Sequence, residues 1–119
     1  MDILKKISHH IDEGHFAEAE TQCAELLSVL EKNGAKNENT YRILFNIAAF
    51  FVDLGHMAKR QDLSRKGLDL MTTHHDVFLQ IIPLSNLFYN LANAKSDLVS
   101  VVNPFELSFQ NIEELVEVK

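Results

Sequence analysis

The sequence has few of the residues that interrupt helices or cross-link a chain. Its 119 residues include four glycines, two prolines, one cysteine and no tryptophan. Glycine and proline are the strongest helix breakers, so their scarcity favours a helix-rich fold. A lone cysteine, Cys23, excludes an internal disulfide and indicates a reducing, cytoplasmic location.

Basic charge and long apolar runs are also scarce. The chain has 11 Lys and Arg against 17 Asp and Glu, a net charge of −6. Nucleic-acid binding depends on clustered basic side chains, so DNA and RNA are not expected partners. No segment reaches the roughly 18 apolar residues of a membrane span, and residues 1–14 lack the apolar core of a signal peptide. We expect no membrane association.

Motifs that carry catalysis or bind cofactors are absent from the sequence. It contains no glycine-rich phosphate loop, no paired-cysteine metal knuckle, no His-Glu-x-x-His and no Gly-x-Ser-x-Gly. Six histidines are present, but neighbours such as His9 and His10 point about 100° apart on a helix and do not converge on a metal. The sequence therefore predicts a non-enzymatic protein without a metal or cofactor.

Apolar residues recur at spacings of three and four, which is typical of amphipathic helices. The length is that of one domain, 1–119. Gly55 is expected to break one helix, and Pro83 and Asn103-Pro104 to begin others. The residues 76–82 are open between a short helical turn and an extended connection. Residues 41–54, apolar nearly all round, are expected at the buried centre. The predicted helices span residues 1–12, 16–30, 41–54, 57–71, 84–98 and 104–118.

Two internal similarities indicate a repeat. Asp12-Glu13-Gly14-His15-Phe16-Ala17 matches Asp53-Leu54-Gly55-His56-Met57-Ala58 in Asp, Gly, His and Ala at an offset of 41. Leu44-Phe45-Asn46-Ile47-Ala48-Ala49 matches Phe88-Tyr89-Asn90-Leu91-Ala92-Asn93 at an offset of 44. A fixed period is the sequence signature of a repeat architecture, so three helix-turn-helix units are expected.

The best-matching segments, Phe88 to Ala94 and Leu44 to Phe51, resemble the tetratricopeptide repeat family. The resemblance implies an all-α fold of three stacked antiparallel hairpins, at about 1–33, 37–73 and 84–118, in a right-handed superhelix. The offsets exceed the family's period of about 34 residues, so the resemblance is that of a divergent member or of a related helical-repeat fold. An unrelated six-helix bundle is the alternative.

Polar residues form rows along three of the predicted helices. Arg42, Asn46, Ala49 and Asp53 are four, three and four residues apart, which places them on one line. Asn86, Asn90, Asn93 and Asp97 repeat these spacings. On the first predicted helix, Lys5, Ser8 and Asp12 are in register with them. The resemblance implies that such rows line a concave groove. The predicted partner-binding residues are Lys5, Ser8, Asp12, Arg42, Phe45, Asn46, Ala49, Asp53, Asn86, Tyr89, Asn90, Asn93 and Asp97.

The sequence thus predicts a protein–protein interaction module that binds a peptide or helix in this groove. The aspartates at the ends of the rows favour a partner of basic character. Two alternatives stay open. The chain is either a structural or oligomerisation domain that forms a homo-oligomer, or a regulatory N-terminal fragment of a larger protein.

Overall fold

The computed structural model describes residues 2–34 and 37–98, and within these ranges it contains helices and turns but no β-strand. The prediction of an all-helical protein is confirmed for this part of the chain. The predicted helix at 104–118 lies outside the described residues. The helices are α1 (Asp2–Asp12), α2 (Phe16–Asn33), α3 (Glu38–Met57), α4 (Gln61–Thr73), α5 (His75–Ile81) and α6 (Leu84–Leu98).

The connection between α2 and α3 follows from local capping. Gly34 adopts the left-handed conformation, with φ 79°, and its N–H donates to the Leu30 carbonyl, which ends α2. Asn37 then begins α3, because its side chain accepts a hydrogen bond from the Thr40 amide at 2.9 Å. The Thr40 hydroxyl in turn accepts from the Asn37 amide at 3.2 Å, which completes a capping box.

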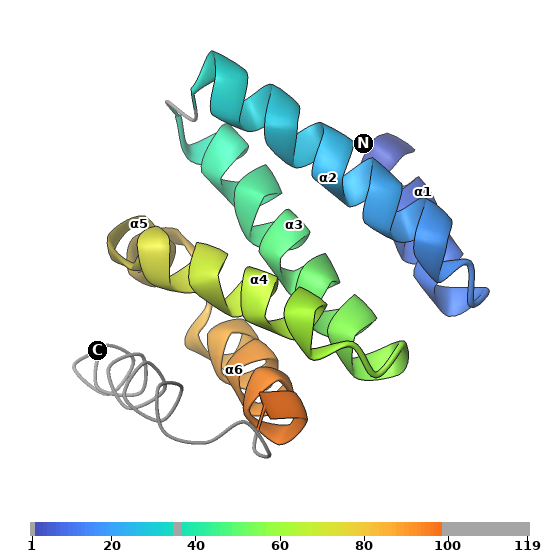
Figure 1. The fold of residues 1–119 in the computed structure, drawn as a ribbon. Coiled ribbons are helices and arrows are strands. Elements are labelled where there is room, and N and C mark those ends of the chain that lie inside the picture. The colour runs from blue at the N-terminus through green and yellow to red at the C-terminus, as the bar shows by residue number, and fades with distance from the viewer. Residues whose placement is uncertain (1, 35–36, 99–119) are drawn as a thin grey trace.

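Helix α3 is the centre of the fold, as its all-round apolar sequence predicted. Figure 1 shows it in the middle, with α1 and α2 on one side and α4, α5 and α6 on the other. It packs against each of these five helices. Such a position requires apolar side chains around most of the helix. Its buried residues are Leu44, Phe45, Ile47, Ala48, Phe51, Val52, Leu54 and Gly55.

Gly55 does not break α3, contrary to the prediction. The helix continues through it to Met57, and α4 begins at Gln61 rather than at Met57. Gly55 is buried where α3 meets α4, and a Cβ added there would lie 2.8 Å from the Ser64 Cα. The glycine is therefore needed for the close approach of two helices. The actual break comes at Lys59, which has a left-handed φ of 56°.

A second glycine brings the same helices together. A Cβ on Gly67 of α4 would lie 2.6 Å from the Ala48 carbonyl oxygen and 2.6 Å from Val52 Cγ2. These distances are shorter than ordinary van der Waals contacts. Gly55 and Gly67 thus set the tight packing of α3 against α4.

The segment that the sequence left open is a short helix. The preceding helix was predicted to end at residue 71, but α4 extends to Thr73 and α5 begins at His75. Helix α5 is anchored by Phe78, which is buried and meets the Phe45 ring edge-on at 5.3 Å between centroids. Pro83 precedes α6 as predicted, and its carbonyl accepts from the Asn86 amide at 3.0 Å.

Candidate partner-binding surface

The predicted polar rows lie on α1, α3 and α6, and α3 packs against both of the others. The rows are therefore carried by neighbouring helices. The side chains of Asn93, Ala49 and Asp53 are half-buried. The side chain of Asp97 is not among those described. The exposed members are Lys5, Ser8 and Asp12 on α1, Arg42 and Asn46 on α3, and Asn86 and Tyr89 on α6.

Two predicted site residues are part of the core, which corrects the sequence-based surface. Phe45 is buried because α5 covers it through Phe78. Asn90 is only 5% exposed, although it was expected to face solvent. Its Oδ1 is buried without a hydrogen-bond partner among the described residues. The rows were assigned from spacing along single helices, which carries no information on how deeply a neighbouring helix covers them.

Asn46 and Asn90 nevertheless share one local geometry. Asn46 Nδ2 donates to the Arg42 carbonyl at 2.9 Å, and Asn90 Nδ2 donates to the Asn86 carbonyl at 2.9 Å. Both bonds reach back four residues along their helix. Each fixes the orientation of an amide that has further donor and acceptor capacity. Only Asn46 holds that capacity at the surface.

Arg42 is held in place by structural contacts. Its Nη2 donates to Glu38 Oε2 at 2.9 Å, and its Nη1 donates to the Ile81 carbonyl at 3.0 Å. The second bond ties the start of α3 to the last residue of α5. Arg42 therefore stabilises the α5 connection and has fewer donors left for a partner.

The carboxylates of α1 and α3 influence each other at one end of the rows. Burial raises the pKa of Asp53, and the negative charge of Asp12 raises it further, while His56 acts in the opposite direction. Asp12 is the last residue of α1, and Asp53 lies one turn before the end of α3. The ends of the α1 and α3 rows thus place the exposed Asp12 and the half-buried Asp53 in one acidic cluster.

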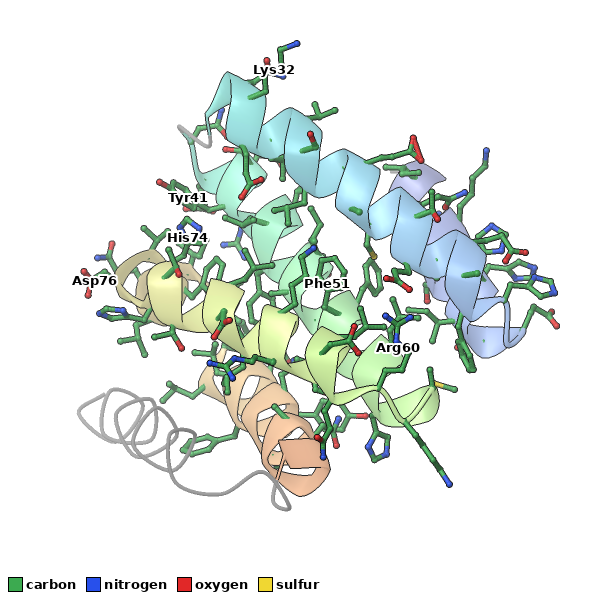
Figure 2. The ribbon with its side chains drawn as sticks, viewed as in Figure 1. Lys32, Tyr41, Phe51, Arg60, His74 and Asp76 are labelled. Atoms are coloured by element: carbon green, nitrogen blue, oxygen red, sulfur yellow. The ribbon has the colours of Figure 1, made fainter. Side chains whose placement is uncertain are left out.

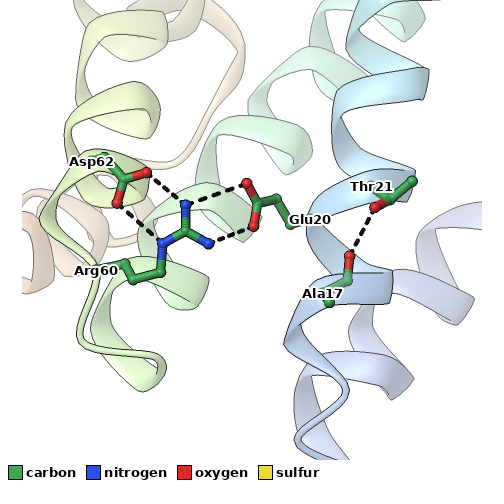
Figure 3. A network of polar contacts seen from close by, with 5 residues as sticks. All are labelled: Ala17, Glu20, Thr21, Arg60 and Asp62. Atoms are coloured by element: carbon green, nitrogen blue, oxygen red, sulfur yellow. Dashed lines mark hydrogen bonds and ion pairs between the residues drawn. The ribbon is translucent and has the colours of Figure 1, made fainter.

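An ion network joins α2 and α4 (Figure 3). Arg60 Nη1 donates to Glu20 Oε1 at 2.7 Å, and Arg60 Nη2 donates to Asp62 Oδ2 at 2.7 Å. The hydrogen bonds that Arg60 donates to Asp62 and Glu20 raise the pKa of Arg60, and Arg60 lowers the pKa of Asp62. Arg60 is exposed, yet it ties the first turn of α4 to α2.

A pocket of about 380 Å³ opens beyond that network, at the other ends of α2 and α4. His74 lines this pocket and lies close to Tyr41, with 6.2 Å between the two ring centroids (Figure 2). Burial lowers the pKa of His74, and Glu31 partly offsets this effect. The pocket is lined by Leu27, Leu30, Glu31, Gly34, Leu44, Thr73 and His74. Sequence analysis missed this pocket. Leu27 and Leu30 belong to an ordinary apolar stripe of one helix, and the spacing of such a stripe does not show where neighbouring helices leave a cavity.

Within residues 2–34 and 37–98, no three His, Cys, Asp or Glu side chains are placed to hold a metal ion. His10 and His15 do come together, with ring centroids 5.7 Å apart. Cys23 is fully buried, and burial raises the pKa of its thiol to about 12. A buried, protonated thiol is a poor nucleophile and acts here as a core residue.

Comparison of the chain with protein-family models, with curated proteins and with solved structures finds no match. No helix in the described part of the chain is both long and apolar enough to cross a membrane.

Proposed function

We propose that this protein is a non-enzymatic interaction module that binds a basic peptide or helix across α1, α3 and α6. The observation that carries the proposal is the Asp12–Asp53 cluster. Burial makes the ionised form of Asp53 costly, and Asp12 adds repulsion. Perturbed ionisable groups of this kind concentrate at functional sites. A lysine or arginine of a partner would neutralise the cluster.

The packing of the helices supports a tetratricopeptide-like arrangement of this surface. Helix α3 contacts both α1 and α2, and α6 contacts both α3 and α4. In stacked hairpins, the first helix of each unit packs on both helices of the preceding unit. Asn46 and Asn90 each donate to the carbonyl four residues earlier, which is consistent with equivalent positions in two units. In this arrangement α1, α3 and α6 line the groove.

A free, buried Cys23 suits a reducing compartment, and we propose a cytoplasmic location on that ground.

A structural or oligomerisation domain is the second candidate, and one surface favours it. Val29 is exposed on α2, beside a shallow hollow of about 320 Å³ that Ile3 and Leu26 also line. An apolar surface of this kind can join two copies of a chain. Light scattering separates the candidates, because the interaction module is monomeric without its partner.

The proposed function is tested with a phage-displayed library of random 12-residue peptides. Selection on the full chain should enrich sequences rich in Lys and Arg. Each selected peptide should lose about 1 to 3 kcal/mol of binding free energy when Asn46 is changed to Ala, since this removes a partner of its backbone. Asp53→Asn should slow association and flatten its salt dependence.

Lys59→Ala and Arg65→Ala serve as matched controls. Lys59 is exposed in the turn between α3 and α4, and Arg65 is exposed on α4, so neither belongs to the polar rows. Both should leave the affinity of the selected peptides unchanged. The proposal is wrong if no basic peptide is enriched. It is also wrong if binding responds to the two control variants and not to Asn46→Ala or Asp53→Asn.

A further inference from the structure

The pocket that His74 lines contains none of the predicted partner-binding residues. Part of its wall is apolar, because Leu27 and Leu44 are buried there and Leu30 is half-buried. Its volume of about 380 Å³ lies within the range of about 300 to 1,000 Å³ that is typical of small-molecule sites. The three leucines can therefore hold the apolar body of a small ligand.

The rest of the wall offers hydrogen-bond acceptors. Glu31 and Thr73 both line the pocket and are exposed, so a carboxylate and a hydroxyl lie on its solvent side. His74 is half-buried, and burial lowers the pKa of its imidazole. The ring is therefore neutral at pH 7, and one of its nitrogens accepts a hydrogen bond. Among the described lining residues, Glu31 thus carries the only charge.

The Glu31 carboxylate has no cation paired with it in the described part of the chain. No ion pair or hydrogen bond joins its side chain to another of residues 2–34 and 37–98. Lys32 does not line the pocket, and its side chain points away from His74 (Figure 2). Glu31 also lies in the last turn of α2, where the partial negative charge of the helix C-terminus disfavours a carboxylate. A cationic ligand would offset this repulsion.

We propose that this pocket binds a small primary amine with an apolar body. The body packs against the three leucines. The ammonium group has three donors, which match the acceptors of Glu31, Thr73 and His74. Glu31 repels an acidic ligand, and a neutral ligand leaves its charge without a counterion. The site does not depend on the proposed groove, since the two share no residue.

Titration of the full chain with phenylbutylamine, followed by the leucine methyl signals in NMR, tests the site. The signals of Leu27, Leu30 and Leu44 should shift and saturate. The signal of Leu26, which lines the separate hollow beside Val29, should stay unchanged. The proposal is wrong if the amine shifts none of the three pocket leucines, or if it shifts Leu26 equally.

Two ligands with the same apolar body, phenylbutanol and phenylbutanoate, show whether the pocket selects a cation. The amine should bind about three- to fivefold more tightly than the alcohol, as expected of an ion pair at the protein surface. The carboxylate should bind most weakly of the three. Equal affinities for the amine and the alcohol overturn the proposal.

Glu31→Gln removes the charge and keeps the size of the side chain. It should weaken binding of the amine about three- to fivefold and leave binding of the alcohol unchanged. The matched control is Glu18→Gln, because Glu18 is an exposed carboxylate at the other end of α2. The control should keep full affinity for the amine, and the methyl spectra without ligand show that both variants are folded. Equal weakening by the two variants would indicate attraction by the net negative charge and would contradict a site at Glu31.

Discussion

At the scale of single residues, burial decides which side chains matter for stability. Phe51 is among the largest fully buried side chains, and the Lys66 amine lies 5.0 Å from its ring centroid. The aromatic ring thus packs in the centre while its face meets a cation from α4. Tyr89, by contrast, is 64% exposed. Residue type alone would rank these two aromatic side chains alike.

Replacing Phe51 by alanine should therefore destabilise the protein by about 3 to 5 kcal/mol, because the change leaves a large cavity beneath α4. Urea unfolding followed by circular dichroism measures this loss. Tyr89→Ala is the matched control and should change the free energy of unfolding by less than about 0.5 kcal/mol. A loss below about 1 kcal/mol for Phe51→Ala would contradict the central position of α3.

Cys23 should resist thiol reagents in the folded protein. Its thiol is fully buried, and burial raises its pKa to about 12, so the thiolate is scarce at pH 8. The reaction with a disulfide reagent should be at least about 100-fold slower than in the urea-unfolded chain, where the pKa returns to about 8.5. Absorbance of the released thiol gives both rates. Equal rates would show that Cys23 is accessible.

At the scale of helices, close crossings explain features that local rules misassign. Helix α3 continues through Gly55 because the rest of the helix is strongly apolar and its packing outweighs one unfavourable residue. Gly67 of α4 meets the Ala48 carbonyl and Val52 in the same way. These glycines have no special φ and are needed for space. A rule based on backbone propensity predicted a break at Gly55, because it does not include the neighbouring helix.

Gly55→Ala separates the two explanations by the sign of its effect. Helix propensity alone would stabilise the protein by about 1 kcal/mol. The clash of the new Cβ with the Ser64 backbone should instead destabilise it by about 1 to 3 kcal/mol. Thermal unfolding reports the sign. Adding Ser64→Gly should not restore stability, since the close atoms include the Ser64 N and Cα. A stabilised Gly55→Ala variant would show that α3 and α4 are further apart.

At the scale of the whole molecule, a stability cost marks the proposed binding surface. Asp53 has a raised pKa, so its folded form holds a proton more tightly than its unfolded form. Such a group stabilises the fold below its unfolded pKa and loses this contribution as the pH rises through the folded value. At neutral pH the ionised Asp53 therefore destabilises the fold. Functional surfaces commonly include residues that destabilise the folded protein.

Asp53→Asn should accordingly raise the melting temperature at pH 7, because it removes a charge that burial and Asp12 both disfavour. The gain should shrink as the pH falls and vanish below about pH 4, where the wild-type carboxyl is protonated in both states. Melts between pH 3.5 and 7 measure it. The control Asp69→Asn alters an exposed carboxylate 3.8 Å from Arg65 and should give no gain. A pH-independent gain would exclude ionisation of Asp53 as the cause.

The sequence by itself determined the class of fold and most of its helices. Periodic apolar residues and local caps such as Gly34 and Asn37 act over a few residues, so they can be recognised without a neighbour. The central position of α3 followed from its all-round apolar composition. The polar rows were also found, since their spacing is a property of one helix. The third hairpin depends on residues outside the described part of the chain and stays a proposal.

Only the tertiary structure decided which row residues remain at the surface. Asn46 and Asn90 occupy the same place in their rows, and each donates to the carbonyl four residues earlier. Asn46 is nevertheless exposed, whereas Asn90 is buried. Phe45 was predicted at the surface but is buried, because Phe78 of α5 covers it. The sequence left open whether the α5 segment is helical. The pocket that His74 lines is formed between residues of α2, α3 and α4. Burial is a property of contacts between helices distant in sequence, and spacing along one helix does not encode it.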